Sequence, residues 1–344
     1  MGQCFFLFVF AAPLSWGLTR VVMHFALRRA LLDIPNVRSS HSTPTLRGGG
    51  LAIAGIVLAG GIAAVPLSAL PWEFSWAWLS GSLVIAAVGW QDDLYGVRPG
   101  KRALVHLVAS VAVMAALGGL PQIRLGSWTL SLGWTGSVLA VAGIMWFLNL
   151  YNFMDGIDGI ASVEAVTMGG FGGALLWWQG ESGLAFLSFL IAAACAGFLW
   201  WNWMPAKIFM GDVSSGLLGY QLASLAVASE RRGVLPLLVW GILGGVFIFD
   251  ATATLLRRVL NGERLYEAHR SHAYQRAVQS GFNHAQVTTA VLLINVCLGA
   301  LACITVVRPS LMLPVFLVAF GGLAGVYLWV EQRKPMYESR RGLP

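Results

Sequence analysis

Charged residues are scarce in this chain of 344 residues. Only 11% of them are Asp, Glu, Lys or Arg, and 57% are apolar, whereas a soluble domain usually carries about 25% charge. Apolar runs of roughly 17 to 25 residues recur along the whole length, and runs of that length can cross a bilayer as helices. The shortage of charge therefore argues against a soluble protein and predicts an all-α polytopic membrane protein.

Cysteine is rare as well, and its pattern argues against a metal or redox motif. The four cysteines lie within or beside apolar runs without metal-ligand spacing, so we interpret them as small packing residues. The first apolar run, 3–24, follows no Lys or Arg and shows no cleavage site, which favours a retained span over a signal peptide. The net charge of +7 is typical of basic cytoplasmic loops, and we expect no nucleic-acid partner.

The apolar runs predict about 11 transmembrane helices in a single domain, 1–344. They lie near residues 3–24, 51–70, 75–91, 103–119, 134–151, 160–178, 183–201, 214–229, 234–256, 285–306 and 311–330. With the N-terminus outside and the C-terminus cytoplasmic, 18 of the 22 basic residues fall on the inner side and 4 on the outer side, as the positive-inside rule requires. Alternating residues near 123–132, around Gly126-Ser127, predict a short extracytoplasmic β-hairpin.

The same orientation gathers the aspartates on one side. All seven lie in cytoplasmic loops or at the inner ends of spans, and these loops fall near 25–50, 92–102, 152–159, 202–213 and 257–284. Acidic side chains at membrane depth are costly and usually mark function. Of the seven, we assign the chemistry to Asp92, Asp93, Asp155, Asp158 and Asp212, and interpret Asp250, within the ninth span, as a structural ion-pair partner.

Three loops carry carboxylates in patterns that suit a cation or a phosphate. Adjacent Asp92 and Asp93 repel each other, and Mg²⁺ relieves such repulsion with one or two carboxylates plus phosphate oxygens; two unrelated acids at a solvated helix end are the alternative. Asp155 and Asp158 are three residues apart, so a helical turn would place them on one face. Asp212 precedes a helix N-terminus, which favours anions, although an aspartate there can also act as a cap without catalytic role.

Two further loops are basic. His269 and His272 share their loop with several arginines, including Arg270, and this company suits phosphate better than zinc; a merely basic cytoplasmic loop is the alternative. The loop 25–50 combines His41 and Arg47 with a glycine run, a combination suited to anion contact.

Together these loops resemble the polyprenyl-phosphate N-acetylhexosamine-1-phosphate transferase family. The resemblance covers nearly the whole chain, in the family's order, through Asp33-x-Pro-Asn-x-Arg, Gly48-Gly49-Gly50, Asp92-Asp93, Asn152-Phe-Met-Asp155-Gly-Ile-Asp158-Gly and Pro205-Ala-Lys-Ile-Phe-Met-Gly-Asp212. One motif departs from the peptidoglycan-type members, which carry consecutive histidines. The sequence here is His269-Arg270-Ser271-His272, which looks more like the O-antigen-initiating members.

The resemblance implies transfer of an N-acetylhexosamine-1-phosphate from a UDP-N-acetylsugar to undecaprenyl phosphate, with release of UMP, in the bacterial inner membrane. The cofactor implied is Mg²⁺, with Mn²⁺ as a substitute, and the active site would face the cytoplasm. A homodimer is left open. The implied metal site comprises Asp212, Asn152, Asp92 and Asp93. The implied catalytic residues are Asp92, Asp93, Asp155, Asp158, His269 and His272, and the implied substrate-binding residues are Asn202, Lys207, Arg270, Arg47 and His41.

Two points of mechanism remain open at the level of sequence. The second pKa of a phosphate is about 6, so the acceptor is already ionised at neutral pH, and we favour direct attack over an aspartyl-phosphate intermediate. The rival function is a cation- or proton-coupled transporter. Such a protein should carry acids near the membrane midplane, often in two repeated halves, whereas here the acids lie at loop ends and no repeat is visible.

Overall fold

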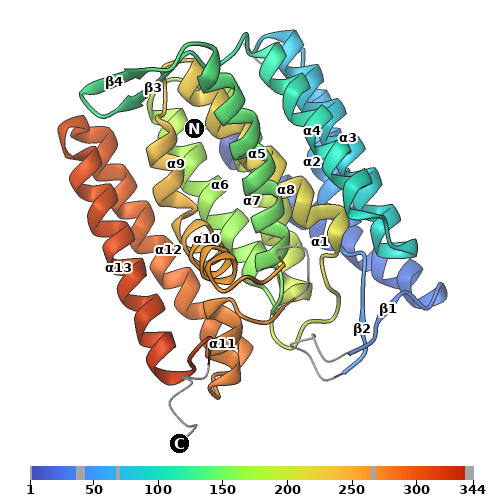
Figure 1. The fold of residues 1–344 in the computed structure, drawn as a ribbon. Coiled ribbons are helices and arrows are strands. Elements are labelled where there is room, and N and C mark those ends of the chain that lie inside the picture. Colours follow the sequence, from blue (N-terminus) through green and yellow to red (C-terminus); the bar gives the residue numbers. More distant parts are fainter. Residues whose placement is uncertain (1, 36–42, 67–69, 265–268, 338–344) are drawn as a thin grey trace, which may run out of the picture.

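The protein is a bundle of roughly parallel helices (Figure 1). The computed structural model describes residues 2–35, 43–66, 70–264 and 269–337. The described helices are α1 (Gly2–Arg28), α2 (Gly50–Ala64), α3 (Trp72–Tyr95), α4 (Pro99–Ala116), α5 (Trp134–Met154), α6 (Ile160–Trp178), α7 (Ser182–Asn202), α8 (Asp212–Arg231), α9 (Leu237–Leu243), α10 (Gly245–Leu260), α11 (Ala273–Gln279), α12 (His284–Val307) and α13 (Met312–Arg333), with a 3₁₀ turn at Pro309–Leu311.

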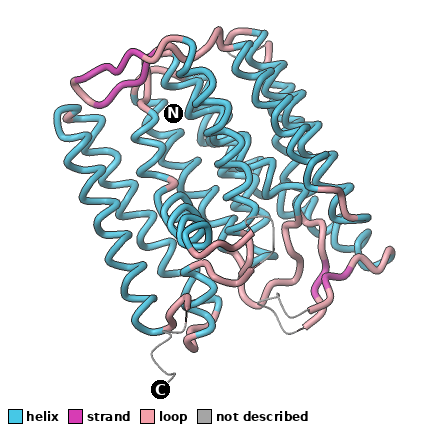
Figure 2. Tube along the Cα trace, in the orientation of Figure 1, coloured by secondary structure: helices cyan, strands magenta, loops and turns pink. Residues whose placement is uncertain are grey.

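The short strands form two antiparallel pairs. β3 (Gln122–Leu125) pairs antiparallel with β4 (Trp128–Ser131), with Ile123 opposite Leu130, which confirms the hairpin predicted from the alternating pattern. Gly126 turns the chain with a φ of 78°, a backbone conformation that favours glycine. At the opposite end of the bundle, β1 (Leu32–Asp33) pairs with β2 (Thr45–Leu46), and Figure 2 shows the two pairs at opposite ends of the helices.

The predicted spans overlap helices, and the structure supports membrane crossing for about half of them. In the described ranges, five helices are long and apolar enough to cross a membrane: α5, α6, α7, α12 and the stretch Pro309–Arg333. A sixth candidate is the pair α9 and α10. The prediction of a helical membrane protein is thus confirmed, while the count of 11 spans stays a prediction.

The ninth predicted span, 234–256, is not one continuous helix. It breaks at Gly244, and α10 turns away from α9 by 84°; Figure 1 shows α10 nearly end-on while its neighbours run along the bundle. Two glycines, Gly244 and Gly245, meet at the break, and glycine pairs are a common cause of sharp kinks. The bend carries α10 sideways, and an apolar groove is lined by residues of α10, α11, α12 and α13.

Helix α8 lies at the centre of the bundle and positions the site. Nearly all of its residues are buried, and it packs against α2, α3 and α5. Small residues allow this close approach: a Cβ on Gly219 would stand 2.7 Å from the Cα of Leu148 in α5. Because α8 begins at Asp212, its central position brings that aspartate into the middle of one end of the bundle.

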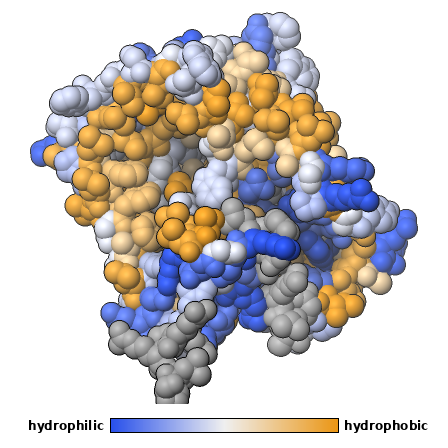
Figure 3. Space-filling view, in the orientation of Figure 1, coloured by the Kyte–Doolittle hydropathy of each residue, from blue (hydrophilic) through white to orange (hydrophobic). Residues whose placement is uncertain are grey.

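The two ends of the bundle differ in character. Figure 3 shows apolar atoms over the flank formed by α12 and α13, and hydrophilic atoms gathered at the lower end of the bundle around α11. At the hairpin end, Arg124 is paired with Glu230 at 3.1 Å, which ties β3 to the last turn of α8. The polar end near β1 and β2 is the one that holds the cleft.

Candidate active site

A polar cleft of about 170 Å³ opens at the N-terminal end of α8. Six of the residues predicted for the site line it, namely Arg47, Asn152, Asp155, Asp158, Asn202 and Asp212. Three polar lining side chains were not in the predicted site: Asp33, Gln275 and His284. The cleft thus joins segments that are far apart in the sequence, from the loop 25–50 to the start of α12.

Asp212 is the most highly connected acid of the cleft. Its Oδ1 accepts a hydrogen bond from Asn152 Nδ2 at 3.0 Å and lies 3.5 Å from Arg47. Its Oδ2 accepts from Arg102 Nη1 at 3.2 Å. The side chain is 22% exposed, so Asp212 is held in place and still reaches the cleft.

Asp93 holds the start of α8 and does not face the cleft as Asp212 does. Its carboxylate accepts the backbone N–H groups of Asp212 at 2.9 Å and Val213 at 3.1 Å, which are orphan donors at the start of α8. It also pairs with Arg47 at 2.7 Å, and its side chain is only 2% exposed. Asp93 therefore caps α8 and fixes the position of Asp212, and it does not line the cleft; a catalytic role for Asp93 stays a prediction.

Asp92 lies beside Asp93 and points to another partner. It forms an ion pair with Arg102 and accepts the backbone N–H of Val97 at 2.6 Å. Because Arg102 also contacts Asp212, this arginine bridges two carboxylates of the predicted metal site. Among the basic residues near Asp92, the structure thus selects Arg102 as its partner.

The glycine run 48–50 explains how Arg47 reaches the cleft. The backbone N–H groups of Gly49 and Gly50 donate to the carbonyls of Phe209 and Met210, both at 2.9 Å. A Cβ on Gly50 would stand 2.6 Å from the Cβ of Ser214, so only glycine permits this contact. The run lays the loop 43–50 along the segment before α8, with Arg47 against the aspartates.

Two residues tie the floor of the cleft together. Asp158 accepts the backbone N–H of Ala206 at 3.0 Å. Asn202 accepts the N–H of Gly159 and donates to the carbonyl of Ile208, each at 3.0 Å. Both residues therefore join the loop after α5 to the loop after α7, and Asn202, which is buried, positions the cleft as well as lining it.

The carboxyl groups of the site differ in acidity. Burial, and then the nearby Asp212, raises the pKa of Asp155 to about 7. Burial raises the pKa of Asp93 to about 6, although Arg47 opposes the shift. Burial and a hydrogen bond to Asp212 raise the pKa of Asp92. Burial would also raise the pKa of Asp212, but the bond with Asp92 and the two arginines hold it below its ordinary value. Asp92 is thus the weaker acid of this pair, and Asp212 is ionised at neutral pH.

The predicted histidine motif lies behind the cleft wall. His272 is the N-cap residue just before the short helix α11, and its Nδ1 lies 3.6 Å from Asp250 Oδ1. Asp250 also accepts the N–H groups of Ala273 and Tyr274 at 2.7 and 3.1 Å, so it holds the start of α11 and is a structural partner, as predicted. The ring of His269 lies 4.8 Å from that of His272, and burial lowers the pKa of His269 to about 4. It is therefore neutral at pH 7.

The other predicted binding residues are more distant or not described. Lys207 is exposed, and its Nζ lies 5.1 Å from the ring centroid of Trp201, so it is turned away from the lining. Arg270 is half-buried in the loop before α11 and does not line the cleft. His41 lies outside the described residues. Roles in substrate binding for these three residues stay predictions.

A magnesium ion is compatible with the donor set around Asp212. In the described part of the chain, no three Asp, Glu, His or Cys side chains gather closely enough to hold a metal by themselves. Mg²⁺, however, is usually bound by one or two carboxylates together with substrate phosphates and water. Ionised, partly exposed Asp212 meets that need, with the amide of Asn152 beside it. A bound cation would compete with Arg47 and Arg102 for the same oxygens.

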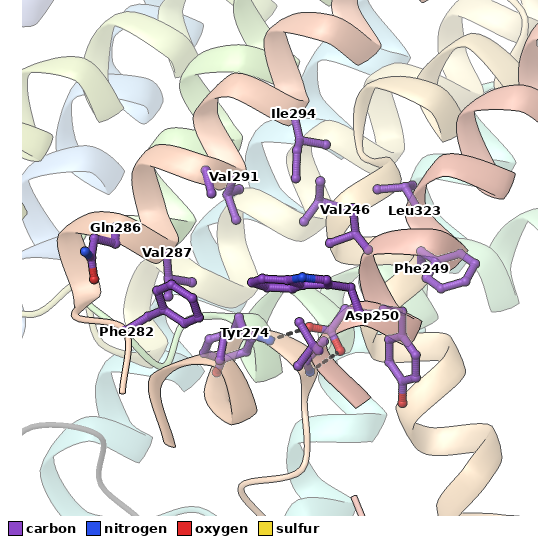
Figure 4. A pocket seen from close by; sticks show the side chains of 17 residues that line it. Val246, Phe249, Asp250, Tyr274, Phe282, Gln286, Val287, Val291, Ile294 and Leu323 are labelled. Atoms are coloured by element: carbon purple, nitrogen blue, oxygen red, sulfur yellow. Dashed lines mark hydrogen bonds between the residues drawn. The ribbon is translucent and has the colours of Figure 1, made fainter. Parts of the chain in front are cut away.

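An apolar groove of about 230 Å³ lies on the other side of α11. Figure 4 shows Val291, Ile294 and Leu323 along it, with Tyr274 and Asp250 at its floor. Helix α11 is the shared wall: Tyr274 faces the groove and the next residue, Gln275, lines the polar cleft. A polar site and an apolar groove are therefore separated by one short helix.

This combination defines a class of protein, a multi-pass helical membrane protein with a polar site at one end of its helices. Residues 75–230 match the model of "Glycosyl transferase family 4". A "Probable undecaprenyl-phosphate N-acetylglucosaminyl 1-phosphate transferase" of Bacillus subtilis (strain 168) is 30% identical over 81% of this chain and 78% of its own length. A "Decaprenyl-phosphate N-acetylglucosaminephosphotransferase" of Mycobacterium leprae (strain TN) is 30% identical over 85% of this chain and 80% of its own length.

A shorter match extends to a further branch. A "Phospho-N-acetylmuramoyl-pentapeptide-transferase" of Moorella thermoacetica (strain ATCC 39073 / JCM 9320) is 34% identical over 48% of this chain and 52% of its own length. The chain belongs to glycosyl transferase family 4, which confirms the family predicted from the motifs. The narrower likeness to O-antigen-initiating members stays a prediction.

Proposed function

We propose that the protein transfers an N-acetylhexosamine-1-phosphate from a UDP-N-acetylsugar to undecaprenyl phosphate and releases UMP. N-acetylglucosamine-1-phosphate is the first candidate, because it is the sugar in the names of the two relatives that match along most of the chain. The observation that carries the proposal is the cleft around Asp212, where an ionised carboxylate and two arginines lie at the N-terminus of a central helix. The product would serve O-antigen or a related cell-envelope polysaccharide.

The cleft residues suit a reaction between two phosphates. An oxygen of the lipid phosphate attacks the sugar-bearing phosphorus, the bond from that phosphorus to the UMP oxygen breaks, and UMP leaves with the electron pair. Arg47 and Arg102 both pair with Asp212. When a substrate phosphate binds, its oxygens can take the place of the Asp212 carboxylate as partners of these two arginines. Asp212 and Asn152 would hold Mg²⁺ or Mn²⁺, which when bound neutralises charge on the diphosphate and on the leaving UMP.

The surroundings of the cleft suit a lipid acceptor. The cleft itself is polar, whereas the groove behind α11 is lined by side chains such as Val287 and Val291. A lipid phosphate needs both environments. We place the 11 helical segments across the bacterial inner membrane, with the N-terminus outside and the cleft facing the cytoplasm, because the basic residues then lie on the cytoplasmic side.

The test is UMP release by the purified protein in detergent with undecaprenyl phosphate. Four donors separate the sugars: UDP-GlcNAc, UDP-GalNAc, UDP-FucNAc and UDP-QuiNAc. We expect UMP with at least one donor in Mg²⁺, and none in EDTA. Absence of UMP with all four donors would contradict the proposal. The transporter alternative instead predicts cation or proton flux in proteoliposomes without UMP, and family membership favours the transferase.

A further inference from the structure

His284 lies outside every predicted motif and yet lines the cleft. It is the first residue of α12, and its Nδ1 lies 3.2 Å from Asp158 Oδ1, with the side chain 17% exposed. One turn later, Thr288 donates its hydroxyl to the backbone carbonyl of Asp158 at 2.8 Å. Two consecutive turns of α12 therefore hold the same aspartate, one through its side chain and one through its backbone.

Asp158 is the point at which three segments meet. Its Oδ1 faces His284, and its Oδ2 accepts the backbone N–H of Ala206. These contacts join the loop after α5, the loop after α7 and the start of α12. With both oxygens engaged, the carboxylate is oriented by its neighbours, so the geometry of the cleft floor depends on the partner that His284 supplies.

A reciprocal cap holds the start of α12, which carries His284. Asn283 caps α12 by accepting the N–H of Gln286 at 2.9 Å, and the Gln286 side-chain oxygen accepts the N–H of Asn283 at 2.9 Å. Deeper along the helix, Asn295 donates to Glu164 at 2.7 Å and to Thr167 at 3.0 Å, both in α6. The polar contacts thus continue from the cleft into the bundle and lock α12 to α6.

The imidazole of His284 can contact Asp158 in one of two ways, depending on whether its Nδ1 carries a proton. When Nδ1 carries a proton it donates to the carboxylate at 3.2 Å; when it is bare it can accept only the backbone N–H of Asp158, which lies at 3.5 Å. The shorter contact is to the carboxylate, and charge-assisted hydrogen bonds are the stronger kind. The geometry therefore favours Nδ1–H donating to Asp158. The cleft also presents Asp33, Arg47, Asp155 and Asp212 near this pair.

We propose that His284 is a positioning residue for the sugar-nucleotide donor, acting by holding Asp158 and, through it, the two loops of the cleft floor. The inference rests on the proposed transferase function. His284 and Asp158 line the polar cleft and not the apolar groove. The donor is polar throughout, whereas the acceptor would also be held by its apolar chain, so the KM for the donor should rise more than the KM for the lipid acceptor.

The experiment compares His284→Ala, His284→Asn and Thr288→Val with the wild type in the UMP assay, varying donor and lipid separately. Asn places an amide N–H close to where Nδ1–H stood. We expect His284→Ala to raise the donor KM about tenfold, equivalent to about 1.4 kcal/mol, with His284→Asn recovering most of that loss. Thr288→Val, which removes the second contact to Asp158, should raise the donor KM in the same direction by a smaller factor.

The control is His24→Ala. His24 is exposed on α1, and its ring contacts the carbonyl of Arg20 in the same helix, so this variant should match the wild type. An unchanged donor KM in His284→Ala overturns the inference while the transferase function stands. An equal loss in donor KM, lipid KM and thermal stability, without rescue by Asn, also overturns it, since that pattern indicates general damage. A wild type that releases no UMP from any donor overturns the proposed function and this inference with it.

Discussion

Gly89→Ala tests the placement of Asp212 without touching any polar side chain of the cleft. Gly89 lies on α3 where that helix crosses the start of α8. A Cβ at this position would stand 2.3 Å from the carbonyl oxygen of Asp212 and 2.9 Å from the Cα of Val213. Both are backbone atoms, so no side chain can turn aside. Ordinary contact begins at 3.4 Å, so the start of α8 has to retreat by about 1 Å.

The size of the expected effect follows from that displacement. A shift of about 1 Å in a catalytic constellation can cost on the order of 10²-fold in rate, which corresponds to about 2.7 kcal/mol. The same shift stretches the two hydrogen bonds from the start of α8 to Asp93, and loss of such a cap costs about 0.5–2 kcal/mol of stability. We therefore expect kcat to fall about 100-fold in a protein that is still folded.

The assay is the initial rate of UMP release, with thermal unfolding in detergent as the check on folding. The matched control is Gly170→Ala on α6, where an added Cβ meets no atom within 4 Å. Alanine there should leave turnover unchanged and stabilise the helix by about 0.5–1 kcal/mol. If Gly89→Ala turns over at the wild-type rate, the close contact between α3 and α8 is not what fixes Asp212, and the reasoning fails.

Two further predictions concern acidity and the cleft floor. Since burial raises the pKa of Asp155 to about 7, the negative charge of this carboxyl develops as the pH rises through 7, and it should weaken the binding of metal-free UDP. Calorimetry should show UDP affinity falling with rising pH in the wild type but not in Asp155→Asn. A pH trend that survives in Asp155→Asn would refute the assignment. Asn202→Ala leaves the Gly159 N–H and the Ile208 carbonyl without their partner, at about 1–3 kcal/mol each, so its unfolding midpoint should drop clearly. Asn149→Ala, which removes a bond within α5, is its control, and equal midpoints for the two variants would contradict the role of Asn202.

The sequence predicted the positions of the helices better than the directions in which they run. Long apolar runs identify helices because membrane-depth backbone must satisfy its own hydrogen bonds, and the pattern around Gly126 located the hairpin. Hydrophobicity averaged over a window does not register a change of direction, so it predicts one continuous span where the chain breaks at Gly244. The physical signal of this break was present in the sequence as two adjacent glycines within an apolar run.

The site was predictable where its residues belong to motifs and unpredictable where it depends on long-range packing. Asp212 and Asn152 do meet in the cleft. Lys207 belongs to the same motif loop as Asp212, but a motif does not set the direction of a side chain, and Lys207 lies against Trp201. His284 is 126 residues from Asp158 in the chain, and only the packing of α12 on α6 brings them together. The polar residues at 284, 288 and 295 lie on one face of α12, and this pattern is the signal in the sequence that indicates a polar contact of this helix.

The central claim is that Asp212 and a bound cation support transfer of the sugar phosphate to a lipid. The most direct measurement is mass spectrometry of the lipid product, together with UMP, after incubation of wild type and Asp212→Asn with UDP-GlcNAc, undecaprenyl phosphate and Mg²⁺. We predict equal amounts of UMP and undecaprenyl-diphospho-N-acetylglucosamine from the wild type, neither in EDTA, and almost none from Asp212→Asn. Full activity of folded Asp212→Asn, or full wild-type activity in EDTA, would contradict this claim.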